Sequence, residues 1–470
     1  MPEFILALDA GTTSVRAAIF GLDGTVRGQS ATTLVTHHGA GGLAEQDAET
    51  VWNAVRQVIA GALAGASLNP ADIAAIGLAT QRTSAVVWDR RGGAALTPLV
   101  LWSDLRGTET ARALAANGFP VAPQQAAAKL GAMLATLDVP ASRMAWGGLD
   151  SFLIFRLSGG AAHITERSQA WPTGYLDLAD LGWNRRLIAH QAIDAGLFPM
   201  LVDSWGALAV TDPSAFGARV AIAADLADQQ SALLAHGAGA AKITFGTAAA
   251  MDVDTGAALV FVGAGLPPLI ASSVGGQSRF CVEGMINSAG QAIDWLRERF
   301  ALGDHALFDT LAGDVVDTAG AAFLPALPGL GAPDPDPARR AMLTGLSGAV
   351  ERGHLARAGY EGVAFRVRQV VERLAEIPGL ALPEVIGLDG GLSRSAVFVQ
   401  ILADLIGAPV RRHAFADATL LGAALAAARG AGLAVEEDAL IRFKTPVAPR
   451  LSRDAATQRF MDWKAALALA

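Results

Sequence analysis

The sequence predicts a two-domain α/β protein, and three observations support this. The chain has 470 residues, whereas one domain usually has roughly 100 to 200. Short apolar runs typical of buried strands alternate with longer segments of helical periodicity. A strand followed by Gly and Thr occurs twice, at residues 4–12 and 242–247. We therefore expect domains at residues 1–236 and 237–470, with a hinge at Gly237–Gly239.

Composition and charge argue against several classes of protein. The formal net charge of -8 disfavours a general nucleic-acid binder, because affinity for phosphate backbones depends on clustered Lys and Arg. The longest uncharged stretch, residues 255–278, holds Pro267 and Pro268, so it predicts paired strands with a turn and not a membrane span. The N-terminus shows no secretory signal, and the single cysteine, Cys281, excludes an internal disulfide. We expect a cytoplasmic protein with no nucleic-acid or membrane partner.

The opening segment predicts a phosphate-binding turn between two short apolar strands, residues 4–8 and 15–20. The polar residues between the strands are Asp9, Gly11, Thr12, Thr13 and Ser14. The glycine permits a backbone geometry that other residues resist, and the hydroxyls and amides after it can converge on an anion. Asp9 would repel a phosphate unless Mg²⁺ lay between them, and Arg16 adds a positive charge. The alternative is a hairpin that binds nothing, because short glycine motifs give many false matches.

A second group of polar residues follows the next predicted buried strand. Residues 73–79 are apolar, and the polar segment Thr80–Ser84 comes directly after them. Open α/β sheets present ligand-binding groups at the carboxyl ends of their strands, so Arg82 and Thr83 are candidate substrate contacts. The alternative for Arg82 is an ion pair with a surface carboxylate.

The segment D-A-G-T-T-S-x-R at residues 9–16 resembles the first phosphate motif of the FGGY carbohydrate kinases, relatives of actin, hexokinase and the Hsp70 ATPase domain. Further segments resemble motifs of this family in the family's own order, so the resemblance covers nearly the whole chain. Within the family it is strongest to the glycerol kinases. The resemblance implies the duplicated, ribonuclease H-like fold of actin-like ATPases, with the active site in the interdomain cleft. It also implies ATP and Mg²⁺ as cofactors, with substrate and phosphate bound by the first domain and the nucleotide by the second.

The resemblance extends to A-D-Q-Q-S-A-L-L at residues 227–234, which is similar to the family segment that carries the general base. Transfer to a primary alcohol needs a carboxylate there, because the alcohol is a poor nucleophile near neutral pH. Asp228 is therefore the expected base and, with Asp9, an expected Mg²⁺ ligand. Gln229 would contact a substrate hydroxyl. Two alternatives stay open: Asp228 is only a helix N-cap, or the base is Asp225.

Further positions concern the substrate. Trp102 lies in a segment similar to the family's apolar-W-x-D-x-R motif, so we expect it to stack on the carbon skeleton of a polyol, with a core position as the alternative. Arg82 matches a family arginine that holds substrate hydroxyls, but Thr83 stands where glycerol kinases have Glu. Gln124 replaces a Tyr that contacts substrate. Both departures suit a longer neutral polyol or a ketose.

The resemblance assigns the nucleotide to three segments in the second half of the chain. Residues 242–247 resemble the second phosphate motif, residues 325–337 a long loop that approaches the nucleotide, and residues 389–395 the adenosine motif. The expected contacts are Gly246, Thr247, Gly329, Gly390, Gly391 and Ser395. The alternative for the adjacent glycines is tight packing before a helix. Residues after 434 predict a peripheral tail.

The resemblance therefore implies an enzyme that transfers phosphate from ATP to a terminal hydroxyl of a small polyol or sugar. The departures at Thr83 and Gln124 support an alternative, a xylulokinase-like pentulose kinase. A non-catalytic, nucleotide-dependent sensor on the same fold is a third interpretation, against which Asp9, Asp228 and the two Gly-Thr turns argue. Dimers are common among relatives, so a homodimer is left open.

Overall fold

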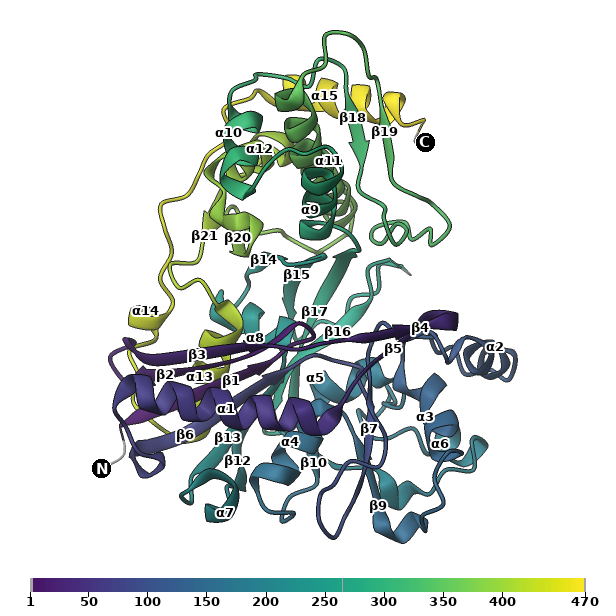
Figure 1. The fold of residues 1–470 in the computed structure, drawn as a ribbon, viewed down its shortest axis with the longest axis vertical. Coiled ribbons are helices and arrows are strands. Elements are labelled where there is room, and N and C mark those ends of the chain that lie inside the picture. The colour runs from purple at the N-terminus through teal and green to yellow at the C-terminus, as the bar shows by residue number, and fades with distance from the viewer. Residues whose placement is uncertain (1–2, 264, 469–470) are drawn as a thin grey trace. The chain divides into compact units, whose positions relative to one another are not determined.

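The computed structural model describes residues 3–263 and 265–468 and confirms the predicted α/β class (Figure 1). The described chain forms two compact units. Unit 1 runs to Ala235 and also contains Leu269–Arg279 and Thr419–Leu440, and unit 2 contains the remaining residues. Two segments from the second half of the chain therefore belong to unit 1.

Unit 1 is built on a six-stranded sheet with the order β12-β13-β6-β1-β2-β3. In chain order these strands are β1 (Phe4–Ala10), β2 (Ser14–Gly21), β3 (Val26–Thr33), β6 (Ile73–Thr80), β12 (Trp205–Val210) and β13 (Ala221–Ala227). Strands β1, β6 and β13 run parallel to one another, whereas β2 is antiparallel to β1. The parallel strands are buried along nearly their whole length, which explains their continuous apolar sequence.

Helix α1 (Ala48–Ala66) packs against β2 and β3. Its N-terminus is capped by the carboxylate of Asp47, which accepts a hydrogen bond from the backbone N–H of Thr50 at 2.6 Å. Its buried face includes Val51, Val55 and other small apolar residues at helical spacing. The helix ends at Ser67, where the backbone turns to a left-handed conformation with a φ of 56°.

Helix α13 (Ala418–Gly430) approaches the unit 1 sheet and α8 (Asp228–Ala235) very closely. A Cβ atom on Gly422 would lie 1.7 Å from the carbonyl oxygen of Ser231, and one on Gly77 would lie 2.0 Å from the carbonyl oxygen of Ala423. Neither position can hold a side chain without movement of the backbone. Glycines in β6 and α13 therefore permit this contact.

Shorter elements complete unit 1. The strands are β4 (His37–Gly39), β5 (Leu43–Gln46), β7 (Val86–Asp89), β8 (Leu99–Val100), β9 (Met144–Gly147), β10 (Ile164–Glu166) and β11 (Met200–Val202). The helices are α2 (Thr108–Ala116), α3 (Ala126–Leu134), α4 (Leu149–Leu157), α5 (Arg167–Ala170), α6 (Arg185–His190), α7 (Pro213–Phe216) and α14 (Glu437–Leu440). The one-turn helix α5 matters most for the site, because it contacts β13.

The second large sheet has the order β16-β17-β15-β14-β20-β21. Its strands are β14 (Ala241–Phe245), β15 (Ala249–Gly256), β16 (Pro268–Val274), β17 (Gln277–Ile286), β20 (Ile386–Gly390) and β21 (Val410–Arg412). Strands β16 and β17 lie partly in the uncharged stretch at residues 255–278, with Gly275 and Gly276 between them at positive φ. Across the described residues, no helix has the length and apolar character needed to cross a membrane.

The elements of unit 2 outside this sheet are α9 (Gly290–Arg299), α10 (His305–Gly313), α11 (Arg352–Ala375), α12 (Ala396–Ile406), α15 (Arg453–Ala466), β18 (Ala322–Leu324) and β19 (Met342–Thr344). The expectation of a peripheral tail after residue 434 is wrong. Trp463 in α15 is 4% exposed, packs against Phe365 with 5.1 Å between ring centroids, and donates from Nε1 to the carbonyl oxygen of Phe323 at 3.0 Å. Helix α15 is therefore part of the unit 2 core.

Candidate active site

The carboxyl ends of β1, β6 and β13 lie side by side in the unit 1 sheet. Ala10 is paired with Thr80, and Thr80 is paired with Ala227. The residues that leave these strands are Gly11, Gln81 and Asp228. The sheet therefore brings the predicted phosphate turn, the Arg82 segment and the predicted base to one end, where parallel sheets usually bind ligands.

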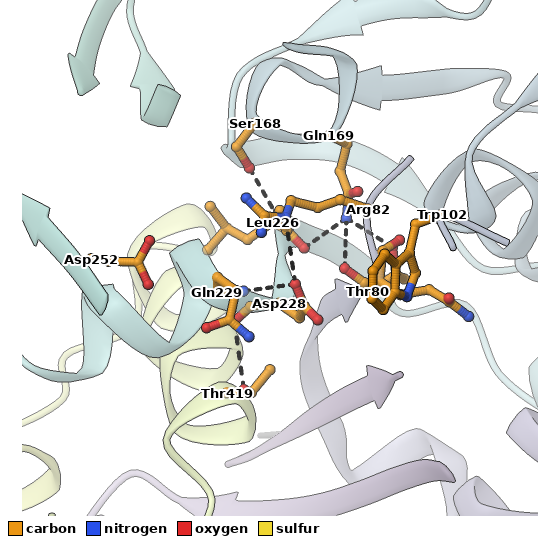
Figure 2. Close-up of polar contacts among 12 residues, drawn as sticks. Thr80, Arg82, Trp102, Ser168, Gln169, Leu226, Asp228, Gln229, Asp252 and Thr419 are labelled. Carbon is orange, nitrogen blue, oxygen red and sulfur yellow. Dashed lines mark hydrogen bonds and ion pairs between the residues drawn. The ribbon is translucent and has the colours of Figure 1, made fainter. Parts of the chain in front are cut away.

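Asp228 and Arg82 form an ion pair at this end of the sheet, with 3.8 Å between Oδ1 of Asp228 and Nε of Arg82 (Figure 2). Their side chains are 25% and 12% exposed, respectively. The backbone N–H of Gln229 donates to Oδ1 of Asp228 at 2.8 Å, and the hydroxyl of Thr419 donates to the carbonyl oxygen of Asp228 at 3.5 Å. Asp228 is thus a partly exposed carboxylate at the first position of α8, available to accept a proton from an alcohol.

The predicted phosphate turn is a tight hairpin between β1 and β2. The backbone N–H of Gly11 donates to the carbonyl oxygen of Ser14 at 3.1 Å. Arg16 lies opposite Asp9 in the hairpin and forms an ion pair with it. The Asp9 side chain is 2% exposed and that of Arg16 is 39% exposed. The hairpin therefore holds a buried carboxylate beside a cation that reaches the surface.

A ring of hydrogen bonds joins the phosphate turn to the segments around Arg82 and Trp102. The indole Nε1–H of Trp102 donates to Oγ1 of Thr12 at 2.9 Å, and this hydroxyl donates to Oε1 of Gln81 at 3.1 Å. Oε1 of Gln81 also accepts from the hydroxyl of Ser84 at 3.0 Å, and Oγ of Ser84 accepts from the backbone N–H of Trp102 at 3.1 Å. Because the indole is 42% exposed, the core alternative for Trp102 is wrong.

Lys129 supports the Trp102 segment through the backbone. Its side chain is fully buried, and Nζ donates to the carbonyl oxygen of Leu101 at 2.6 Å. Burial lowers the pKa of Lys129 to about 8, although the negative charge of Asp104 raises this pKa and so offsets part of the effect. Asp104 itself accepts from the backbone N–H of Ala44 at 2.7 Å and pairs with Arg106. These contacts fix the loop that presents Trp102.

The two positions that depart from the glycerol kinase pattern differ in their surroundings. Thr83 directly follows Arg82 and has a φ of 67°, in the left-handed region. Gln124 is exposed, and its side chain makes no hydrogen bond with any residue that the structure describes. Thr83 therefore lies near the ion pair of Arg82 and Asp228, because it is the next residue in the chain after Arg82. Gln124 makes no hydrogen bond to either member of this ion pair.

In unit 2 the predicted nucleotide glycines lie where β14 and β20 end. Phe245 is paired with Gly390, and the backbone N–H of Gly391 donates to the carbonyl oxygen of Phe245 at 2.6 Å. A Cβ atom on Gly390, whose φ is 84°, would lie 2.3 Å from that oxygen. Gly246 accepts a hydrogen bond from the backbone N–H of Gly290 at 3.0 Å. Tight packing thus accounts for the adjacent glycines, and their contact with nucleotide stays a prediction.

The other predicted nucleotide contacts have local partners. The carbonyl oxygen of Thr247 accepts from the backbone N–H of Ala289 at 3.0 Å. Gly329 has a φ of 101° and lies in a loop that returns on itself at Pro337. Ser395 caps α12, and its hydroxyl donates to Oδ1 of Asp309 at 2.6 Å.

A buried charge network precedes the adjacent glycines. Nε2 of His236 lies 3.0 Å from Oδ2 of Asp389, and Nζ of Lys242 lies 2.8 Å from Oδ2 of Asp252. Burial raises the pKa of Asp389, but the hydrogen bond from His236 and the charge of Lys242 outweigh burial and hold that pKa below its ordinary value. Asp389 is therefore an ionised group inside unit 2.

The sequence profiles of the FGGY family of carbohydrate kinases match both halves, the N-terminal domain over residues 4–235 and the C-terminal domain over residues 241–431. The chain belongs to this family. It is 35% identical to the glycerol kinase of Thermus brockianus, over 99% of this chain and 98% of the relative. It is 34% identical to the glycerol kinase of Xanthobacter autotrophicus, over 99% of each chain.

Solved structures of similar fold include a glycerol kinase from Plasmodium falciparum, with a TM-score of 0.88 and 22% identity over 99% of this chain and 97% of that chain. A xylulose kinase from Lactobacillus acidophilus gives a TM-score of 0.84 and 20% identity over the same shares. These likenesses confirm the actin-like ATPase fold. As an FGGY kinase, the protein transfers a phosphate group to an alcohol.

The donor set of this FGGY kinase fits Mg²⁺ bound together with phosphates. Within the described ranges, no three His, Cys, Asp or Glu side chains group so that they could hold a metal ion. Mg²⁺ in kinases is usually held by one or two carboxylates plus substrate phosphates and water. Asp9 and Asp228 offer oxygen ligands of that kind at the ends of β1 and β13, the two strands that flank β6. A Mg²⁺ that arrives with the nucleotide therefore suits the residues present.

Inside unit 1 of the kinase lies a cluster of three carboxyl groups that the sequence does not predict, formed by Asp150, Glu166 and Asp225. All three side chains are fully buried. Burial raises the pKa of Asp150 to about 6 and that of Glu166 to about 7. Burial and the charges of its two neighbours raise the pKa of Asp225 well above its ordinary value. Asp225 has no solvent access, which argues against it as the base. The only sign of its burial in the sequence is that an acidic residue interrupts an apolar strand.

Proposed function

We propose that this kinase transfers the γ-phosphate of ATP to a terminal hydroxyl of a small polyol or sugar, with Asp228 as the base. The observation that carries the proposal is the partly exposed Asp228 carboxylate, which pairs with Arg82 where β6 and β13 end. Asp228 would accept the hydroxyl proton as the oxygen attacks phosphorus. Arg82 and Gln229 would hold neighbouring hydroxyls, and the exposed indole of Trp102 would cover the carbon skeleton.

The hairpin turn would hold the transferred phosphate. The amides and hydroxyls of Thr12, Thr13 and Ser14 are donors, and Arg16 contributes a positive charge that is already oriented by Asp9. When bound, Mg²⁺ held by Asp9 and Asp228 would offset negative charge on the phosphates. These groups would stabilise charge and position the reactants, which is most of what phosphoryl transfer requires.

We assign the nucleotide to the C-terminal part of the chain, with residues 1–236 and 237–470 as the substrate and nucleotide domains. The expected contacts are Gly246, Thr247, Gly329, Gly390, Gly391 and Ser395. The Ser395 hydroxyl already caps α12 and binds Asp309. We therefore expect the backbone groups of the glycines to make most of the contacts with the nucleotide. The ADP bound in the Plasmodium falciparum relative supports nucleotide binding by this fold.

Glycerol is the first candidate substrate, because the curated relatives are named glycerol kinases. A longer polyol or a pentulose is the second candidate. Thr83 and Gln124 favour it, since they place a hydroxyl and an amide where glycerol kinases have Glu and Tyr. We also propose that the enzyme is a cytoplasmic homodimer, in line with its family and with the single, buried Cys281.

The test is ADP release from Mg-ATP across a panel that runs from glycerol through erythritol and the pentitols to ketopentoses and hexonates. Activity with glycerol would support the first candidate, and activity with a ketopentose would support the second. Tight ATP binding without transfer to any alcohol would contradict the proposal and favour a nucleotide-dependent sensor. Omitting Mg²⁺ should abolish the release.

A further inference from the structure

The one-turn helix α5 packs against β13, which directly precedes Asp228, and its Gln169 side chain reaches the end of β6, two residues before Arg82. The side-chain amide of Gln169, in this turn, is 4% exposed. Its Nε2 donates to Oγ1 of Thr80 at 2.8 Å and to the carbonyl oxygen of Leu226 at 2.9 Å, with the carbonyl oxygen of Thr80 at 3.3 Å (Figure 2). One side chain therefore joins the last residue of β6 to the second-last residue of β13.

The neighbouring residue of α5 makes a complementary contact. The hydroxyl of Ser168 accepts a hydrogen bond from the backbone N–H of Ala227 at 3.0 Å and donates to the carboxylate of Glu166. Glu166 also accepts from the backbone N–H groups of Ser168 and Gln169, both at 2.8 Å, and from the hydroxyl of Ser204 at 2.9 Å. The turn is thus fixed to a buried carboxyl group at its own N-terminus.

The groups that α5 holds come directly before the proposed reacting residues. Leu226 and Ala227 precede Asp228, and Thr80 lies two residues before Arg82. The acceptors around Gln169 are all oxygens, so they need a hydrogen-bond donor, which the side-chain amide of Gln169 supplies. A shift of about 1 Å in a reacting group can cost about a hundredfold in rate, so these bonds bear on catalysis without touching substrate.

We propose that Ser168 and Gln169 are positioning residues, which set the Asp228 and Arg82 strand ends relative to each other. This inference rests on the proposed function in so far as Asp228 is the base. Unlike Arg82 and Asp228, the two residues make no contribution through charge. They act through the Thr80 hydroxyl and through backbone groups that lie 57 to 89 residues away in sequence.

The test compares Gln169→Met and Ser168→Ala with the control Gln191→Met. Gln191 also makes two hydrogen bonds inside unit 1, to the carbonyl oxygen of Ala127 at 2.8 Å and from the hydroxyl of Tyr175 at 2.7 Å, but touches neither strand end. The kcat of the first two variants should fall about 10- to 100-fold, with the KM for ATP within about twofold of wild type. Gln191→Met should keep the kcat of wild type, even if its melting temperature falls as much as those of the two test variants. Unchanged kcat in both test variants would overturn the proposal.

Hydrogen–deuterium exchange separates this inference from the proposed function. Peptides covering residues 78–84 and 224–230 should exchange faster in Gln169→Met, and the second peptide should do so in Ser168→Ala, but neither should in Gln191→Met. If the wild-type enzyme phosphorylates no alcohol, the proposed function fails, while faster exchange in these peptides would still support the positioning role. Unchanged exchange in both peptides overturns it whatever the activity.

Discussion

Thr83 illustrates how local conformation bears on the site. Its φ of 67° lies in the left-handed region, which a β-branched residue rarely adopts. It lies directly after Arg82, whose guanidinium pairs with Asp228. Such strain persists only where the surrounding structure imposes it, so the turn after β6 is held by its neighbours and not by the preference of Thr83.

Thr83→Asn should raise the free energy of unfolding by about 0.5 to 1 kcal/mol, because Asn tolerates the left-handed region better than Thr does. Urea denaturation monitored by circular dichroism measures this. Thr310→Asn is the control, since Thr310 lies in α10 at ordinary helical angles, where the two residues have similar propensities. A gain of the same size in both variants, or in neither, would contradict the role of the positive φ.

Some site residues could be predicted from sequence and others could not. Arg82 and Asp228 stand at the ends of recognisable apolar strands, and the parallel pairing of those strands brings them together. Gln169 carried no such signal, because its hydrogen-bond partners lie far away in sequence. The hydrogen bond of the Trp102 indole was equally unpredictable, since its acceptor, Thr12, lies 90 residues away in sequence.

At the level of elements, α4, β10 and β13 share the cluster of Asp150, Glu166 and Asp225. The ordinary pKa values are 3.8 for Asp and 4.5 for Glu, and all three are raised in the folded protein. The folded state therefore binds more protons than the unfolded state above about pH 4. The stability from these protons is complete below about pH 4 and is lost as the pH rises through about 6 to 7.

Asp225→Asn should therefore weaken the fall in the free energy of unfolding between pH 4.5 and 8. Each proton held only by the folded state contributes a slope of about 1.4 kcal/mol per pH unit, so the difference between variant and wild type should grow with pH in favour of the variant. Chemical denaturation at several pH values measures it. Asp314→Asn, at an exposed position, is the control. A parallel decline in the variant and wild type would argue against shared protons in the cluster.

The contact of α13 with unit 1 depends on glycine. Gly422→Ala should lower the free energy of unfolding by about 3 kcal/mol or more, because the added Cβ would lie 1.7 Å from the backbone oxygen of Ser231. Thermal and urea unfolding would show the loss. Gly348→Ala, where a Cβ meets nothing within 4 Å, should change stability by less than about 1 kcal/mol. Equal effects at the two glycines would show that α13 can move aside.

Element-level predictions succeeded where periodicity was strong. The strands expected at residues 4–8, 15–20 and 73–79 are present as β1, β2 and β6. Helix α15 was missed, because charged and polar residues are spread along its sequence and its burial rests on a few aromatic side chains such as Phe460 and Trp463. The local hydrophobic pattern therefore predicts whether a helix or strand forms better than it predicts which parts of the fold bury it.

At the scale of the whole molecule, the family motifs are distributed over both units. The phosphate turn, Arg82 and Asp228 belong to unit 1, whereas the segments at residues 242–247 and 389–395 belong to unit 2. The fold class followed from the order of motifs along the chain. That Leu269–Arg279 and Thr419–Leu440 belong to unit 1 could not be predicted, because only long-range packing assigns them.

The most direct test of the central claim is the kcat of Asp228→Asn on the alcohol that the wild-type enzyme uses, with Asp314→Asn as the matched control. Loss of the proton acceptor should lower kcat about 10²- to 10⁴-fold, while the Kd for ATP stays within about threefold of wild type and the Asp314 variant keeps full turnover. Near-normal turnover by Asp228→Asn would contradict the claim that this carboxylate activates the alcohol.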